Sequence, residues 1–245
     1  MTYLVLFLVA AAGGALNSVA GGGSFLTLPA LLYAGVAPVA ANATSTFAMW
    51  PGSLSSTLAY RRELQARKHW LVGLGLVSLA GGLLGAVLLV RTSDTSFMRL
   101  LPWLMLLAAT TFTFGARLRQ MASPRAGHAS FIVVAVVQFL ISIYGGYFGG
   151  GMGIMMLATF ALAGMTDIHE MNGLKSVLGT AINTLALAEF VIRGAVAWRF
   201  GALMVVGAIL GGYFGASGAR SVDPKWIRRF VIVMGWTMTV YFFLR

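Results

Sequence analysis

Residues 18–25 read SVAGGGSF, and the glycine triplet in this stretch separates two apolar segments, residues 2–20 and 24–36. Three successive glycines break a helix and leave backbone N–H groups without intrahelical partners. A second triplet, at residues 149–151, again leads into a short apolar segment, residues 151–165. Broken backbone inside a membrane is tolerated only where it is buried in protein or lines a wet cavity. The two triplets therefore predict short or broken helices within a membrane-embedded fold.

The composition places the rest of the chain in the same setting. Of the 245 residues, 59% are hydrophobic and only 9% are charged, whereas a soluble domain carries about 25% charged residues. Most apolar segments approach the roughly 20 residues that a helical span needs. The segments are residues 2–20, 24–36, 38–60, 69–90, 97–117, 128–148, 151–165, 168–192, 198–219 and 225–244. We predict an all-α integral membrane protein, multi-pass in the inner (plasma) membrane, with a single membrane domain over residues 1–245.

An internal repeat relates the two halves of the chain. Four features recur in order at an offset of 128 to 130 residues. Residues 21–23 align with 149–151, 42–46 with 172–176, Trp70 with Trp198, and 81–85 with 211–215. We therefore predict two repeats, at about residues 2–117 and 128–245. The G-x-x-x-G spacings at Gly81–Gly85, Gly207–Gly211 and Gly211–Gly215 are best explained by close helix packing.

Basic clusters predict the membrane topology, because cytoplasmic loops carry an excess of Lys and Arg. The clusters are Arg61, Arg62, Arg67 and Lys68; Arg117, Arg119 and Arg125; and Arg220, Lys225, Arg228 and Arg229. If every segment crosses, all three clusters fall on the cytoplasmic side and each repeat has five spans. An odd number of spans makes the repeats inverted, an arrangement common in secondary transporters. If residues 24–36 and 151–165 re-enter instead, the count falls from about 10 to about 8.

Several functional classes are excluded by what the sequence lacks. The chain has no cysteine and three widely spaced histidines, so neither a thiolate nor a histidine-rich metal site is expected. The sequence contains no zincin, nucleotide-loop or G-x-S-x-G signature. The net charge of +11 resides in short loops between apolar segments and does not indicate nucleic-acid binding. We expect no cofactor, no metal and no enzymatic activity.

The glycine triplets are candidate anion-binding elements. Each leads directly into a helix N-terminus, at Ser24 and at Met152. A helix N-terminus carries partial positive charge and free N–H donors, which suit an anion. The alternative is a tight turn or a close helix crossing.

Polar residues recur at the start of the next segment in each half. Pro38 suits a first helical turn, and Asn42, Thr44 and Ser45 follow it inside an apolar span. In the second half, Asp167 and Glu170 have capping-box spacing. Asn172, Lys175 and Ser176 follow, with Lys175 about 10 Å into a helix that begins near Ile168. A lysine inside a span usually faces a cavity and is functional; the alternative is that its flexible stem lifts the ammonium to the interface.

Two further polar residues lie in the same span. Asn183 is mid-span, where a pore-lining role and an interhelical hydrogen bond are equally compatible with the pattern. Glu189 precedes Arg193 by four residues, which favours a structural ion pair and leaves a coupling carboxylate as the alternative. The candidate substrate-binding residues are Gly21, Gly22, Gly23, Ser24, Asn42, Thr44, Ser45, Gly149, Gly150, Gly151, Met152, Asn172, Lys175, Ser176 and Asn183.

These motifs together resemble one known family. The stretch from Ser18 to Phe25, Leu28-Pro29, residues 41–45 and Tyr60-Arg61-Arg62 are similar to the TauE/SafE family of sulfite-exporter-like permeases. In the second half, residues 149–151, Asn172, Lys175-Ser176 and Trp198 match as well. The resemblance implies an inner-membrane permease for sulfite, sulfonates or related organic anions. Met152 and Pro51 depart from the family pattern, and they leave the shape of the pocket open.

The sequence therefore predicts a secondary transporter that moves a small anion by alternating access. The alternatives are a passive anion channel and a non-transporting membrane scaffold. The expected partners are the anion, a coupling proton or cation, and membrane lipid, with a homo-oligomer as an open alternative. Substrate identity, transport direction and coupling ion stay undetermined at this level.

Overall fold

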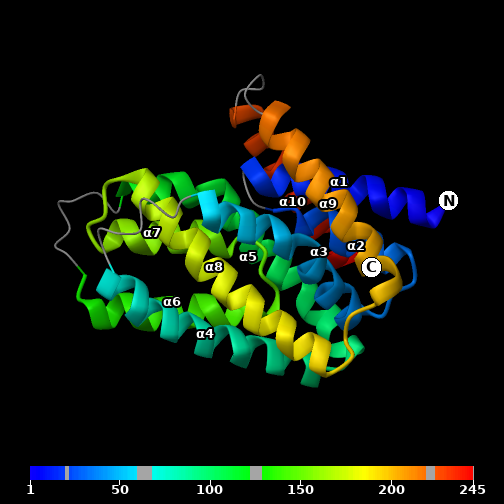
Figure 1. Cartoon of the computed structure of the whole chain (residues 1–245), viewed down its shortest axis with the longest axis horizontal. Helices are drawn as coiled ribbons and strands as arrows, with labels where there is room; N and C mark the ends of the chain where they lie inside the picture. The colour runs from blue at the N-terminus through cyan, green and yellow to red at the C-terminus, as the bar shows by residue number, and fades with distance from the viewer. Residues whose placement is uncertain (20–21, 60–67, 122–128, 219–223, 245) are drawn as a thin grey trace.

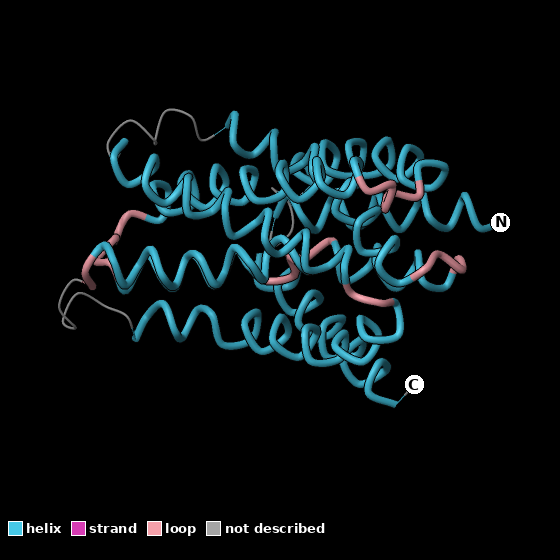
Figure 2. The backbone as a smooth tube through the Cα atoms, turned by 90° about the horizontal axis from the view of Figure 1, so that it is seen from below, coloured by secondary structure: helices cyan, strands magenta, loops and turns pink. Residues whose placement is uncertain are grey.

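A computed structural model of the chain describes residues 1–19, 22–59, 68–121, 129–218 and 224–244. Helices make up nearly all of this described part, and it contains no β-strand (Figure 2). The described residues form ten helices: α1 (Thr2–Val19), α2 (Ser24–Tyr33), α3 (Pro38–Ala59), α4 (Lys68–Arg91), α5 (Asp94–Met121), α6 (Phe131–Tyr147), α7 (Met152–Leu162), α8 (Ile168–Ile192), α9 (Trp198–Gly218) and α10 (Pro224–Leu244). Each predicted apolar segment corresponds to one helix, which confirms the all-α prediction.

The two helices that follow the glycine triplets are short, as predicted. α2 has 10 residues and α7 has 11, so each is about 15–16 Å long. The hydrocarbon core of a bilayer is about 30 Å thick, and neither helix can span it alone. Both end at a glycine with positive φ, Gly35 (81°) and Gly164 (82°). There the N–H of Val36 bonds to the carbonyl of Leu31 and that of Met165 to Phe160, which is the Schellman pattern.

The helices form two bundles, and each bundle takes its fourth helix from the other half of the chain. α9 packs on α1 and α3, and α2 packs on the same two helices; likewise α4 packs on α6 and α8, and so does α7 (Figure 1). The bundles meet where α3 packs on α8. α5 and α10 belong to neither bundle: they pack on each other, and α5 also packs on α7 and α10 on α2. These main pairings stay the same when α1–α5 are exchanged with α6–α10. The division into two repeats stays a prediction from the sequence. Their inversion across the membrane stays a prediction.

Glycines bring the exchanged helices into close contact. A Cβ atom built on Gly211 of α9 would collide with the carbonyl oxygen of Ala11 in α1. On the other side, a Cβ on Gly85 of α4 would collide with the carbonyl oxygen of Ile143 in α6. Small residues of this kind let helix backbones approach closely in lipid, where no hydrophobic force drives association. The predicted packing role of Gly81, Gly85, Gly207 and Gly211 is therefore confirmed.

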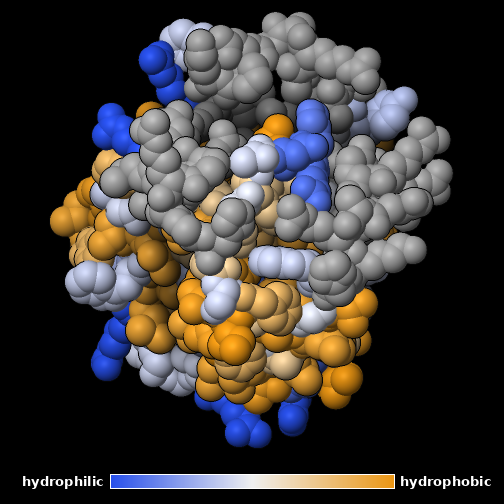
Figure 3. All heavy atoms as spheres, turned by 90° about the vertical axis from the view of Figure 1, so that its left-hand side faces the viewer, coloured by the Kyte–Doolittle hydropathy of each residue, from blue (hydrophilic) through white to orange (hydrophobic). Residues whose placement is uncertain are grey.

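The outer surface is apolar, as expected for a protein in lipid. On α6, Ile132, Val136 and Leu140 lie one turn apart, and each is more than half exposed (73%, 55% and 61%). Three described stretches, within α4, α5 and α8, are long and apolar enough to cross a membrane. Figure 3 shows hydrophobic residues over much of the described surface at the end that lies on the left in Figure 1. These observations identify a multi-pass membrane protein.

Candidate anion-binding site

The second glycine break is held in place mainly by Tyr144, near the end of α6. The backbone carbonyl of Tyr144 accepts hydrogen bonds from the N–H groups of Phe148 (2.8 Å) and Gly149 (3.2 Å). Its hydroxyl donates to the carbonyl of Gly150 at 2.6 Å. Gly149 and Gly151 have φ of 85° and 79°, a conformation that glycine adopts at little cost. One tyrosine thus fixes both sides of the turn that leads into α7.

This turn leaves amide donors at the N-terminus of α7. The N–H of Ile154 bonds to the carbonyl of Gly151 (3.0 Å), and the N–H of Met152 makes a long contact with Gly149 (3.4 Å). Within the described part of the chain, the N–H groups of Gly150, Gly151 and Gly153 donate no hydrogen bond. Gly150 and Gly151 are buried. Three amide donors without a protein partner, at the positive end of a helix, can bind an oxyanion.

Lys175 lies directly beside this N-terminus. Its aliphatic stem covers Gly153, where an added Cβ would stand 3.2 Å from the Lys175 Cδ atom. Its Nζ atom donates a hydrogen bond to Asn172 Oδ1 at 2.9 Å. Both residues come from the first turns of α8, which begins at Ile168 as predicted. Asp167 caps that helix by accepting from the N–H of His169 (2.8 Å). The structure therefore brings together residues 149–153, Asn172 and Lys175.

Asn42 also reaches the second break, although it belongs to the first half. Its side-chain amide donates to the carbonyl oxygen of Tyr147 at 2.9 Å. Tyr147 is the last residue of α6, and its carbonyl would otherwise lack a partner at the helix end. Asn42 is only 2% exposed. This hydrogen bond ties α3 to the segment that leads into the glycine turn.

The first break is arranged differently. Gly22 has φ of 101° and precedes α2, while Gly21 lies outside the described residues. Thr27 donates to the carbonyl of Gly23 (3.2 Å), and its hydroxyl lies 2.6 Å from that of Ser45. A Cβ on Gly23 would lie 2.8 Å from the sulfur of Met49. Side chains of α2 and α3 therefore pack on this break and hydrogen-bond to one another.

Thr44 and Met152 serve mainly in packing. The Thr44 hydroxyl donates to the carbonyl of Ala40 (2.6 Å) and accepts from the N–H of Ala197 (2.9 Å), just before α9. Because a hydroxyl has a single donor hydrogen, Thr44 has none left for a ligand in this conformation. The Met152 side chain fills the space above two glycines, with its sulfur over Gly145 and its methyl group over Gly179. Ser24 begins α2 and is half-buried.

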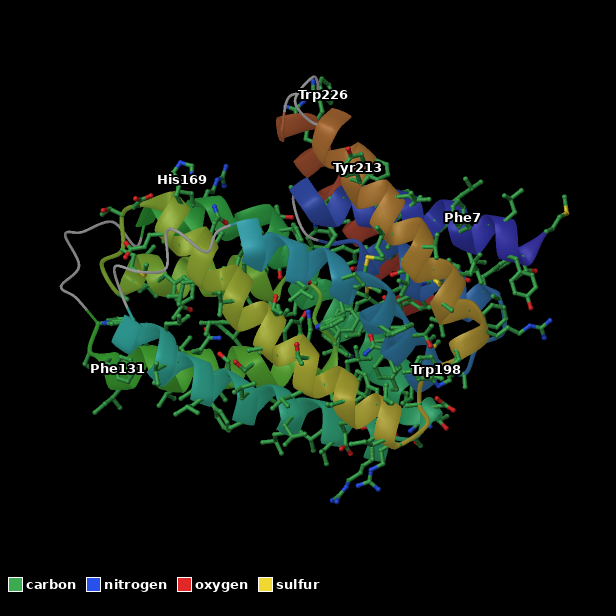
Figure 4. All side chains as sticks on the ribbon, viewed as in Figure 1. Phe7, Phe131, His169, Trp198, Tyr213 and Trp226 are labelled. Carbon is green, nitrogen blue, oxygen red and sulfur yellow. The ribbon has the colours of Figure 1, made fainter. Side chains whose placement is uncertain are left out.

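The other predicted residues of α8 extend away from this site. In Figure 4, α8 begins near His169 at the left-hand end and leads to Trp198 at the other end. Asn183 is half-buried and lies eight residues beyond Lys175, about 12 Å along the axis and about 80° around the helix. Ser176 shares a side with Thr180, whose hydroxyl donates to the carbonyl of Ser53 in α3 at 3.0 Å.

Glu189 lies at the far end of α8. Its Oε1 atom is 2.9 Å from Arg193 Nε, so the predicted ion pair is confirmed. The two partners are four residues apart, and 58% of the Arg193 side chain is exposed. The Glu189 side chain is 11% exposed, and helix pairs at this spacing contribute about 0.3–0.5 kcal/mol to stability. A coupling role for Glu189 stays a prediction.

Sequence reasoning missed two residues of this site, Tyr144 and Gly153. A tyrosine hydroxyl inside an apolar span needs a partner, and its position five residues before a glycine triplet was the available signal. Gly153 carries no such signal, because its role is to leave room for a side chain from another helix.

A helical membrane protein with two bundles, broken half-helices and a basic side chain at one break belongs to the transporter class. The comparisons with known proteins agree with this. The sequence profile of the sulfite exporter TauE/SafE family matches residues 6–242, and the chain belongs to this family.

Several curated relatives are described as probable membrane transporter proteins. One from Haemophilus influenzae is 29% identical over 96% of this chain and 92% of its own length. Another, from Sinorhizobium, is 29% identical over 96% of this chain and 90% of its own length. The probable membrane transporter protein YfcA of Escherichia coli K12 is 27% identical over 96% of this chain and 87% of its own length. No solved structure matches the chain. Family and relatives together place the protein among membrane transporters that act on a small substrate.

Proposed function

We propose that the protein is a secondary permease for a small oxyanion or sulfonate, and that the anion binds where α7 begins. The observation that carries this proposal is the position of Lys175 over Gly153, beside the partnerless amides of Gly150, Gly151 and Gly153. Removing an anion from water is costly unless fixed donors replace its hydration. This site offers amide donors, a helix N-terminus and one ammonium group.

The neutral residues have supporting roles in this proposal. Asn172 orients the Lys175 ammonium through its side-chain oxygen. Asn42 and Tyr144 hold the end of α6 and the glycine turn in place. Thr44 and Ser45 stabilise the packing of α3 against α9 and α2. Transport, not catalysis, is therefore the function that this arrangement supports.

Alternating access is the mechanism we propose for this site. Its support is the exchange of α4 and α9 between two bundles that meet along α3 and α8. Relative movement of such bundles around a fixed site is the usual carrier mechanism in folds with repeats. The second glycine break, near the bundle contact through Asn42, would then be exposed to each side in turn.

Ligand binding to the purified protein tests the site. Sulfite, sulfate, thiosulfate, ethanesulfonate and acetate are compared by thermal shift, since a ligand that binds only the folded state stabilises it by about 2.7 kcal/mol at 100 times its Kd. We expect a sulfur oxyanion or sulfonate to raise the melting temperature of wild type but not of Lys175→Ala. Equal responses of both proteins to every anion would overturn the proposed site.

Transport in proteoliposomes separates the three functional hypotheses. A carrier accumulates the anion against its gradient, and an uncoupler abolishes the accumulation. Conduction at channel rates, with no accumulation, would instead support a passive anion channel. Binding of the anion without any flux would instead support a non-transporting membrane scaffold.

A further inference from the structure

Lys175 lacks an acidic partner within the described chain. α8 packs against α3, α4, α6 and α7. The described parts of α3 and α7 contain no titratable residue, and α6 contributes only tyrosines. The titratable or charged groups of the four packed helices and of α8 itself are Tyr144, Tyr147, Lys68, His69, Arg91, His169, Glu170 and Glu189.

Neither carboxylate of α8 faces Lys175. Glu170 lies five residues earlier, which places it about 140° away around the helix. Glu189 lies fourteen residues later, about 21 Å along the axis, and is already paired with Arg193. Within the described residues, the ammonium therefore has one side-chain acceptor, the neutral Oδ1 atom of Asn172.

An ammonium group in such surroundings is costly. It has three donor hydrogens, and one neutral acceptor replaces only part of its hydration. Buried charges in proteins are otherwise paired with an opposite charge. Lysine differs here from arginine, because a lysine in an apolar environment can give up its proton whereas a guanidinium stays charged.

We propose that Lys175 is the proton-coupling group of the transporter, so that one proton travels with each anion. This inference rests on the anion transport proposed above. When the anion binds at the start of α7, the neutral amine takes up one proton and forms an ammonium–anion pair. When the anion leaves on the other side, the amine returns that proton. For a monovalent anion the complete step moves no net charge.

Thermodynamic linkage makes the coupling reciprocal. An anion that favours the ammonium form must bind more tightly when the proton is already present, by the same factor. Transport of a monovalent anion is then driven by the proton gradient and not by the membrane voltage. A lysine that keeps its charge throughout predicts the opposite: no proton movement, and a current that follows the anion.

The test uses the full-length protein in liposomes that contain a pH-sensitive dye. Potassium and valinomycin clamp the voltage, and ethanesulfonate is the probe because it stays ionised near neutral pH and brings no proton of its own. We expect one proton to enter with each ethanesulfonate. Ethanesulfonate flux without internal acidification would overturn the coupling while leaving the permease function intact. No flux and no binding of ethanesulfonate by wild type would overturn the sulfonate permease itself, and the coupling with it.

Two variants locate the coupling group. Lys175→Arg keeps a positive charge that does not dissociate, so its remaining ethanesulfonate flux should carry no proton and should generate a current. Glu189→Gln, the matched control at the competing carboxylate, should keep one proton per anion. Proton movement that persists in Lys175→Arg, or disappears in Glu189→Gln, would overturn the assignment.

A binding measurement covers the case in which Lys175→Arg does not transport. Calorimetry of ethanesulfonate binding in two buffers with different ionisation enthalpies gives the number of protons taken up per anion. Wild type should take up about one proton where Lys175 is mostly neutral before binding. The measurement is repeated at several values between about pH 6 and about pH 9. If no proton is taken up with the anion at any of them, the proposal is overturned.

Discussion

The two glycine breaks align in the predicted repeats, yet in the described contacts a charged side chain, that of Lys175, covers the helix start only at the second. At the first, Ser45 contacts Thr27 of α2 through a 2.6 Å hydroxyl pair. At the second, the aligned residue is Lys175, which lies over Gly153 of α7. The repeat thus supplies two similar backbone frames. The aligned position is Ser45 in the first half and Lys175 in the second. This difference makes the second break a candidate anion site, whereas the first break is filled by packed side chains.

The largest difference between the breaks should appear when these aligned residues are truncated. Removing one partner of a buried, hydrogen-bonded charge pair costs about 2–5 kcal/mol, and each 1.4 kcal/mol is tenfold in affinity. Lys175→Ala should therefore weaken anion binding by at least about 30-fold. Ser45→Ala should lower thermal stability and change affinity by less than about threefold. Similar losses of affinity in both, measured by titration, would contradict the asymmetry.

The next largest effect should come from the glycine turn itself. Gly151 has φ of 79°, and an added Cβ would stand 3.3 Å from Ala108 Cα. Gly35 has nearly the same φ (81°) but open space around it. Left-handed backbone costs a non-glycine residue about 1–2 kcal/mol, so Gly151→Ala and Gly35→Ala should both be less stable.

Transport separates these two glycine variants. Only Gly151→Ala displaces the amides at the start of α7, and we expect its uptake to fall by about tenfold at equal expression. Gly35→Ala should transport at close to the wild-type rate. Equal uptake by both variants would show that the turn geometry does not matter for the substrate.

A smaller effect should follow from Tyr144→Phe. It removes the hydrogen bond to the carbonyl of Gly150, and a hydrogen bond of this kind contributes about 0.5–1.5 kcal/mol. We expect affinity for the anion to fall about two- to tenfold. Tyr33→Phe is the control, because Tyr33 is 91% exposed. An unchanged Kd in Tyr144→Phe would exclude the tyrosine as a positioning residue.

The smallest effect should come from the ion pair at the far end of α8. Pairs at this spacing contribute about 0.3–0.5 kcal/mol, so Glu189→Gln should unfold within about 1 °C of wild type. Its rate of anion uptake should also stay unchanged. A large loss of uptake would return Glu189 to consideration as a coupling residue.

Hydropathy predicted every helix, but it placed some ends too late. Residues 24–36 were expected as one segment, whereas α2 ends at Tyr33. The apolar pattern continues through Val36, but the positive φ of Gly35 does not allow the helix to continue that far. The same reason shortens residues 151–165 to α7, which ends at Leu162 before Gly164.

The candidate site was predictable only in part. Lys175 stands out as a charge inside an apolar span, and the triplet stands out as a helix breaker. The link from Asn42 to Tyr147 joins residues 105 positions apart, and it depends on how α3 packs against the end of α6. No local pattern encodes such a contact.

The close contact between α4 and α6 has a consequence for how the protein is made. α4 leaves the ribosome long before α6 and α8, yet these are the helices on which it packs. Until they are inserted, the glycine-lined side of α4 has only lipid beside it. Assembly of that bundle must therefore wait for synthesis of the second half, and a chain cut between residues 122 and 128 would need both fragments in the same membrane to regain activity.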